Sequence, residues 1–249
     1  MVSRSNSWVV RFRVVSAPKV RLFCFPYAGG SSTIFARWHS VLPSDVELCA
    51  IELPGHGTRM RERAFATDFV RLVEDLSVAL ERWTDVPFLF FGHSLGAVLA
   101  FACARSLRRR SAAIPVHLFA SARRAPHAPN RDSSEARMTD SQLVESIRQR
   151  GGTPPEILAE PELMNLLLPV IRADFCLLAS YVYSEETPLD CPITTFGGTR
   201  DERATRHDLL DWRVHSSSSF GVEMFEGGHF FVNESWRKVA TRVGVAIAS

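Results

Sequence analysis

The segment Gly92-His93-Ser94-Leu95-Gly96 places a serine between two glycines, directly after the apolar run at residues 88–91. A helix-like pattern begins at Leu95. A strand, a sharp turn and a helix in that order form a nucleophile elbow, in which a strained turn lifts a serine hydroxyl above the end of a sheet. Glycines on both sides of the serine leave room for such a turn. The sequence therefore predicts a nucleophile at Ser94.

Short apolar, β-branched or aromatic runs alternate along the chain with helix-like patterns. Predicted strands lie at residues 8–15, 20–25, 46–51, 88–91, 116–120, 193–196 and 221–225, and predicted helices at 33–41, 68–83, 95–107 and 234 to about 247. Such alternation predicts an α/β fold with a mostly parallel central sheet and helices on both faces. The first strand is the antiparallel candidate, because its alternating pattern leaves one face in water. No repeat or linker divides residues 1–249, so we expect a single domain.

From about residue 126 to 180 the sequence predicts helices without a strand. We expect this insertion to form a helical lid over the carboxyl ends of the strands, where such folds bind ligands; additional core is the alternative. Thr139 and Gln142 form a capping-box pattern that opens one helix, and Gly151-Gly152 ends it. Four prolines predict that the next stretch is divided into short helices, the last over about 169–183. These prolines are Pro154, Pro155, Pro161 and Pro169.

Composition excludes several other classes of protein. Basic and acidic residues number 29 and 27, giving a net charge of +2 without the strongly basic balance of a nucleic-acid-binding domain. The longest small-and-apolar stretch, residues 95–104, is shorter than the roughly 18 residues of a membrane span. The first 20 residues lack the apolar core of a secretory signal, so we expect a cytoplasmic protein. We expect no metal or organic cofactor, because no Cys/His ligand spacing and no H-E-x-x-H is present.

A serine hydroxyl needs a base to remove its proton. In folds that place the serine on such an elbow, the catalytic residues follow along the chain in the order serine, acid, histidine. Among eight histidines, His229 alone follows the last predicted strand in a glycine-rich loop, Gly227-Gly228-His229. His93 would point away from the base position. His56 lies in a loop that could line the pocket but precedes the serine. We therefore expect His229 to be the base.

The acid should lie in the loop after the strand at 193–196. Asp201 occupies that loop and is the preferred candidate, with Glu202 as its rival and Asp208 and Asp211 expected on the next helix. The N–H of Leu95, at a helix N-terminus, should bind the developing oxyanion. A second donor should come from the glycine-containing loop at 25–31, which lacks the P-loop pattern of nucleotide-binding proteins.

Seven segments together resemble the type II thioesterases that accompany modular polyketide and nonribosomal peptide synthetases. They are Phe25-Pro-Tyr-Ala-Gly-Gly-Ser31, Leu53-Pro-Gly55, Phe91-Gly-His-Ser-Leu-Gly-Ala97, Leu168-Pro-Val-Ile-Arg-Ala-Asp174, Pro188-Leu-Asp-Cys-Pro-Ile193, Gly197-Gly198 with Asp201, and Gly228-His229. The similarity spans almost the whole chain in order. Two positions depart from it: Ala102, where many relatives carry glutamate, and His56, where arginine is common.

The resemblance implies an α/β-hydrolase fold with a helical lid. It implies a triad matching Ser94, Asp201 and His229, and oxyanion donors matching the amides of Ala28 and Leu95. It also implies hydrolysis of stalled or aberrant acyl groups from the phosphopantetheine arm of acyl or peptidyl carrier domains. The residues expected to contact the substrate are Tyr27, Gly29, His93 and Phe230.

We expect a monomeric serine thioesterase whose partners are carrier domains, with no nucleic acid and no membrane. Two alternatives stay open. A carboxylesterase, lipase or peptidase on the same fold would use the same triad, since fold does not fix substrate. A non-catalytic chaperone that binds carrier domains would keep the scaffold, although a complete triad argues against it.

Overall fold

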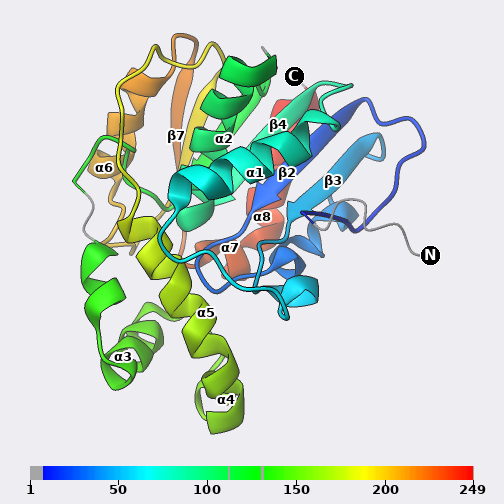
Figure 1. Cartoon of the computed structure of the whole chain (residues 1–249). Coiled ribbons are helices and arrows are strands. Elements are labelled where there is room, and N and C mark those ends of the chain that lie inside the picture. The colour runs from blue at the N-terminus through cyan, green and yellow to red at the C-terminus, as the bar shows by residue number, and fades with distance from the viewer. Residues whose placement is uncertain (1–7, 112, 130–131, 249) are drawn as a thin grey trace.

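A twisted, mostly parallel sheet runs through the protein in the computed structural model, which describes residues 8–111, 113–129 and 132–248 (Figure 1). Within these residues the sheet has seven strands in the order β1-β3-β2-β4-β5-β6-β7. Their bounds are β1 Val9–Arg11, β2 Val20–Phe25, β3 Val46–Ile51, β4 Phe88–His93, β5 His117–Ser121, β6 Ile193–Gly198 and β7 Phe220–Phe225. Only β1, on β3, pairs antiparallel among the described strands, as the sequence predicts.

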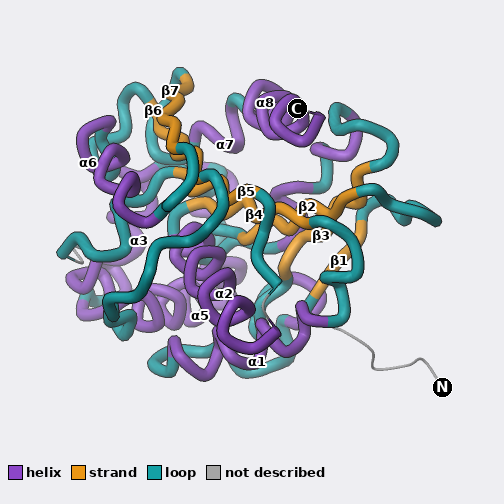
Figure 2. The backbone as a smooth tube through the Cα atoms, turned by 90° about the horizontal axis from the view of Figure 1, so that it is seen from above, coloured by secondary structure: helices purple, strands orange, loops and turns teal. Residues whose placement is uncertain are grey.

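Helices cover both faces of this sheet (Figure 2). α1 and α2 lie on one face and α8 on the other, while α5 runs below the lower edge of the sheet in Figure 1. The helices are α1 Phe69–Glu81, α2 Leu95–Ser111, α3 Asp140–Arg150, α4 Pro155–Leu158, α5 Pro161–Ala179, α6 Arg206–Leu210, α7 Phe231–Glu234 and α8 Trp236–Ala248. Among the described helices none is long and apolar enough to cross a membrane.

The side chains of β4 alternate between two apolar cores, one on each face of the sheet. Phe90 packs edge-to-face on Phe23 and Phe25, with ring centroids 5.8 and 5.0 Å apart. Phe91 points to the opposite face, where its centroid lies 4.7 Å from that of Trp38. Burial on both faces explains why the parallel strands are almost continuously apolar in sequence. Because β2 to β7 run parallel, the loops that follow them emerge at the same edge of the sheet.

The insertion predicted at about 126–180 contains α3, α4 and α5, and residues 130–131 of it lie outside the described residues. Thr139 and Gln142 form both hydrogen bonds of the capping box, and Gly151 ends α3 in the left-handed conformation. The predicted division of the next stretch is confirmed for the short α4, which ends before Pro161, but it is wrong at Pro169, because α5 is one helix of 19 residues. Pro161 stands in its first turn, where an N–H has no helical acceptor. Pro169 lies inside α5.

A proline inside a helix costs about 3 kcal/mol through a lost hydrogen bond and a backbone clash. Apolar packing offsets this cost in α5. Leu168, Ile171 and Phe175 surround the proline turn and are buried together with Leu143 of α3 in a core that belongs to the insertion. Propensity alone therefore predicted the wrong boundary for this helix.

Two further predictions need correction. The helix expected at 33–41 is two 3₁₀ helices, Ser32–Phe35 and Trp38–Ser40, because the Ser32 amide and hydroxyl bind the buried Glu52 carboxylate at 2.9 Å each and fix the entry to the segment. The strand expected at 8–15 pairs only over β1. Beyond it the Arg13 guanidinium donates to the carbonyls of Pro43 and Val46, which draws the chain off the sheet edge.

Gly96 in α2 and Gly244 in α8 provide a matched test of how closely α2 packs on β2. A Cβ at Gly96 would lie 2.1 Å from the Phe25 carbonyl oxygen, whereas one at Gly244 in α8 would lie no closer than 3.5 Å to its neighbours. We expect Gly96→Ala to lower the free energy of unfolding by about 3 kcal/mol or more through overpacking. Gly244→Ala should raise it by about 0.5–1 kcal/mol. Urea unfolding monitored by circular dichroism measures both; an unchanged midpoint for Gly96→Ala would contradict the close approach of α2 to β2.

Candidate active site

Ser94 occupies the turn between β4 and α2 with a backbone φ of +54°. This left-handed conformation is unfavourable for a residue with a side chain and marks stored strain. The neighbouring glycines make the turn possible, since a Cβ at Gly92 would lie 2.2 Å from the Gly96 carbonyl oxygen. The Ser94 amide donates to the Ser121 carbonyl at 2.8 Å, which anchors the turn to β5. The strained elbow predicted from the sequence is therefore present.

Three side chains form a hydrogen-bonded chain at the carboxyl edge of the sheet. His229 Nε2 lies 3.2 Å from Ser94 Oγ, and His229 Nδ1 lies 2.8 Å from Asp201 Oδ2. The other carboxylate oxygen of Asp201 accepts the amides of Arg203 and Ala204 at 2.9 and 3.4 Å, which orients the acid. Glu202, the rival acid, is exposed at the pocket and does not contact His229 in the described structure. The loops after β4, β6 and β7 supply the three groups of the chain.

His93 does not line the pocket, contrary to its expected place at the substrate site. Its side chain is fully buried: Nδ1 lies 2.9 Å from Ser121 Oγ and Nε2 lies 2.9 Å from the His229 carbonyl oxygen. Because that carbonyl only accepts, Nε2 carries the proton. Burial and the neighbouring His229 hold the pKa of His93 well below its usual value. His93 is therefore a neutral support for the backbone of His229. Its position in β4 directs it to the same face of the sheet as Phe91, where its ring centroid lies 5.5 Å from that of Phe231.

The loop after β2 contains backbone amides with different partners. The Gly30 N–H donates to the Tyr27 carbonyl at 2.9 Å, and the Gly29 N–H donates to Asp174 Oδ2 at 2.6 Å. Within the described residues the Ala28 N–H has no protein acceptor, and Ala28 lines the pocket. Leu95 opens α2, so its N–H has no acceptor within the helix. Ala28 and Leu95 thus offer the two amides that an oxyanion beside Ser94 would need.

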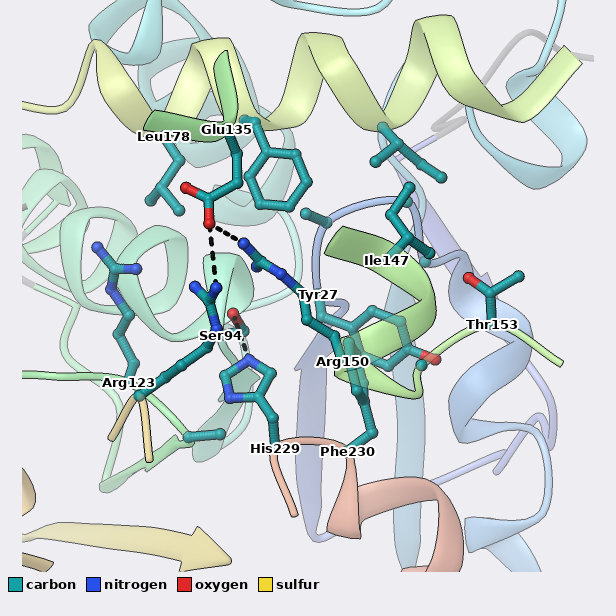
Figure 3. Close-up of a pocket in the computed structure, with 18 of the residues that line it drawn as sticks. Tyr27, Ser94, Arg123, Glu135, Ile147, Arg150, Thr153, Leu178, His229 and Phe230 are labelled. Carbon is teal, nitrogen blue, oxygen red and sulfur yellow. Dashed lines mark hydrogen bonds and ion pairs between the residues drawn. The ribbon is translucent and has the colours of Figure 1, made fainter. Parts of the chain in front are cut away.

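A cavity of about 640 Å³ opens above Ser94 and His229 (Figure 3). Tyr27, Gly29 and Phe230, which the sequence predicts to contact the substrate, line it. The insertion contributes an apolar wall. Its members are Ile147, Ile157, Leu167, Ile171, Phe175 and Leu178. Leu163 and Leu166 of α5 point to solvent instead.

Another wall of the cavity is charged, and no sequence motif predicted it. Glu135 is buried there and accepts hydrogen bonds from Arg150 and, at 3.1 Å, from Arg203 (Figure 3). Arg123 and Arg124 line the same cavity. The cluster escapes sequence reasoning because its members come from the insertion and from the loops after β5 and β6.

His56 also lies elsewhere than expected. It does not line the cavity but is buried behind the loop after β2, with Nε2 2.8 Å from Asp174 Oδ2. Asp174 ends the segment 168–174 that resembles the thioesterases, but its sequence context carries no sign of a partner 118 residues away.

Comparison with known proteins agrees with this geometry. The thioesterase domain family matches residues 20–245. The chain is 41% identical over 234 residues to the gramicidin S biosynthesis protein GrsT of Aneurinibacillus migulanus, and the match covers 94% of this chain and 91% of GrsT. The RedJ thioesterase from the prodiginine pathway of Streptomyces coelicolor has a similar structure, with TM-score 0.85, 38% identity, and coverage of 92% and 91% of the two chains.

The type II thioesterase BorB from the borrelidin cluster is also similar in structure, with TM-score 0.86, 28% identity, and coverage of 97% of this chain and 98% of BorB. At these scores the fold of the described residues follows the same plan as RedJ and BorB. The chain has the α/β-hydrolase fold and belongs to the thioesterase domain family.

Proposed function

We propose that this protein is a serine thioesterase that hydrolyses stalled or aberrant acyl groups from the phosphopantetheine arm of carrier domains in polyketide or nonribosomal peptide biosynthesis. The observation that carries the proposal is the hydrogen-bonded chain Ser94–His229–Asp201 at a strained elbow below an acyl-sized cavity. Membership of the thioesterase family and the similarity to GrsT, RedJ and BorB support the thioester as substrate.

In the acylation step, Ser94 Oγ attacks the thioester carbonyl carbon and its proton passes to His229 Nε2. The carbonyl oxygen becomes an oxyanion that accepts hydrogen bonds from the Ala28 and Leu95 amides. Asp201 holds the Nδ1–H tautomer and stabilises the imidazolium that forms. When the carbon–sulfur bond breaks, the leaving thiolate takes the proton from His229, which leaves an ester on Ser94 and a free pantetheine thiol.

In the deacylation step, a water molecule takes the place of the thiol. His229 removes one of its protons as its oxygen attacks the ester carbon, and the same two amides bind the second oxyanion. The carbon–oxygen bond to Ser94 then breaks, and Ser94 Oγ regains the proton from His229. The free acid leaves and the resting enzyme is restored, so no cofactor is consumed.

The neutrality of His93 assists both steps. Its ring centroid lies 5.6 Å from that of His229, so a charged His93 would oppose formation of the His229 imidazolium. Burial keeps His93 uncharged, and its hydrogen bond to the His229 carbonyl still fixes the loop.

We also propose that one chain is sufficient for activity, since Ser94, His229, Asp201 and both amides come from the same chain. A reducing, cytoplasmic location fits the five free cysteines. A carboxylesterase would use the same triad, and discrimination between sulfur and oxygen esters separates the two activities. A carrier-binding chaperone would not need the aligned triad.

The proposal predicts distinct effects for the two neighbouring acids. Asp201→Asn should lower kcat by on the order of 10⁴, as loss of the corresponding carboxylate does in serine proteases. Glu202→Gln, the matched control one residue away, should leave kcat within about twofold, because exposed charges contribute little. Ser94→Ala should abolish turnover and the acyl adduct that intact-protein mass spectrometry detects in the wild type. A Ser94→Ala protein with full turnover would overturn the proposal.

The apolar wall predicts an effect on acyl-chain length. Leu167 lines the cavity, whereas Leu166 beside it is 62% exposed. Leu167→Trp should lower kcat/KM for a long-chain acyl thioester about tenfold relative to a short-chain one, because the larger indole side chain reduces the cavity volume available to the acyl chain. Leu166→Trp is the control and should preserve the wild-type ratio. Equal ratios in all three proteins would assign this wall to core packing alone.

A further inference from the structure

α5 contacts the loop after β2 through two side chains, Ile171 and Asp174. Because they are three residues apart, they lie on the same face of the helix. A Cβ at Gly29 would be only 2.6 Å from Ile171 Cγ1, and Gly29 has a φ of +75°. Glycine is therefore required at position 29 both for its backbone conformation and for the seating of α5.

Asp174 of α5 connects this helix to two other segments of the chain, the loop after β2 and the loop that contains His56. Its Oδ2 accepts the Gly29 N–H at 2.6 Å and lies 2.8 Å from His56 Nε2. The other ring nitrogen of His56, Nδ1, lies 3.1 Å from the Pro54 carbonyl oxygen. Asp174 and His56 are 1% and 4% exposed, so water does not replace these contacts.

The partners of His56 define its charge. A carbonyl oxygen and a carboxylate oxygen only accept, so both ring nitrogens must donate, which is possible only for the imidazolium. Burial alone lowers the pKa of His56, but the charge and hydrogen bond of Asp174, with the Pro54 carbonyl, raise that pKa above its usual value. The charged groups facing His56 are Asp174 from α5 and Glu52, the residue after β3. His56 and Asp174 therefore form a buried ion pair.

This ion pair fixes the backbone around Ala28. The Ala28 N–H belongs to the same planar peptide unit as the Tyr27 carbonyl, which accepts the Gly30 amide. The next peptide unit ends in the Gly29 N–H, which Asp174 holds. Hydrogen bonds thus hold the peptide planes on both sides of Ala28, and this fixes the direction of the Ala28 N–H. One of these two hydrogen bonds comes from Asp174 of the helical insertion.

Resting on the thioesterase activity proposed above, we propose that Asp174 and His56 are positioning residues that hold the Ala28 amide in the direction needed to bind the oxyanion, and that they make hydrolysis depend on the seating of α5. A movement of α5 away from the loop would withdraw the Asp174 carboxylate from Gly29 and His56 together. α5, whose side chains line the cavity, thereby also controls the direction of the Ala28 amide.

The first test compares two aspartates of the insertion by steady-state kinetics on an acyl thioester. Asp174→Ala should lower kcat about 10- to 100-fold with KM within about threefold, since outright loss of an oxyanion donor costs roughly 10²–10³. Asp140→Ala is the matched control. It removes an exposed ion pair with Arg172 of α5 and should change kcat less than about twofold. Circular dichroism and the Tm establish that both variants are folded.

The second test is the pH profile of kcat, which a merely structural role would not move. The His56 cation is present below its pKa and is lost as the pH rises through it, so wild-type kcat should fall at alkaline pH. Asp174→Asn removes the carboxylate that raises this pKa, so the fall should move to lower pH. His56→Arg keeps a cation that does not titrate in this range, so the fall should disappear.

Each outcome distinguishes the positioning role from the proposed function. A folded Asp174→Ala protein with wild-type kcat, or an alkaline fall that His56→Arg leaves in place, would overturn the positioning role while the thioesterase stands. A wild-type protein that hydrolyses no thioester would overturn the proposed function itself, and the positioning role with it. If Asp174→Ala does not fold, the pH profiles of His56→Arg and Asp174→Asn decide whether the positioning role holds.

Discussion

The left-handed backbone at Ser94 is the constraint on which the rest of the site depends. A serine with a φ of +54° persists only where the surrounding structure enforces it. Here Gly92 of β4 lies in backbone contact with the start of α2, and Gly96 of α2 lies in backbone contact with the end of β2. The tight turn raises the hydroxyl above the sheet edge. Parallel strands beyond β4 then deliver their following loops to the same edge, so Asp201 and His229 arrive beside it.

In the proposed reaction, charge is distributed around Ser94, His229 and Asp201 so that a transient cation on His229 is tolerated. Asp201 faces one side of the ring and His93, neutral and buried, supports the loop. A second, separate ion pair, His56–Asp174, lies behind the loop after β2. Its hydrogen-bond partners in the described structure are Gly29 and Pro54, and not Ser94, His229 or Asp201. The charges proposed for catalysis and for positioning are thus kept apart, so that in this proposal α5 influences the oxyanion donor without altering the charges around His229.

Much of this arrangement follows from local sequence. The elbow, the glycine-rich loop of His229 and the alternation of strands and helices depend on neighbouring residues, and the predicted residues 94, 201 and 229 meet in space. The contacts that escaped prediction are long-range. Asp174 meets Gly29 across 145 residues, and no spacing rule relates them. Pro169 stays inside α5 for the same reason, since tertiary packing and not propensity decides the helix there.

The central claim, hydrolysis of carrier-bound acyl thioesters, is tested most directly by kcat/KM for one acyl group presented on a holo carrier domain, on coenzyme A and as an oxygen ester. We expect the value for the carrier-bound thioester to exceed that for the oxygen ester by roughly 100-fold or more and that for coenzyme A by about tenfold, since specificity is a ratio of kcat/KM values. Equal values for the thioester and the oxygen ester would contradict the claim and indicate a general esterase.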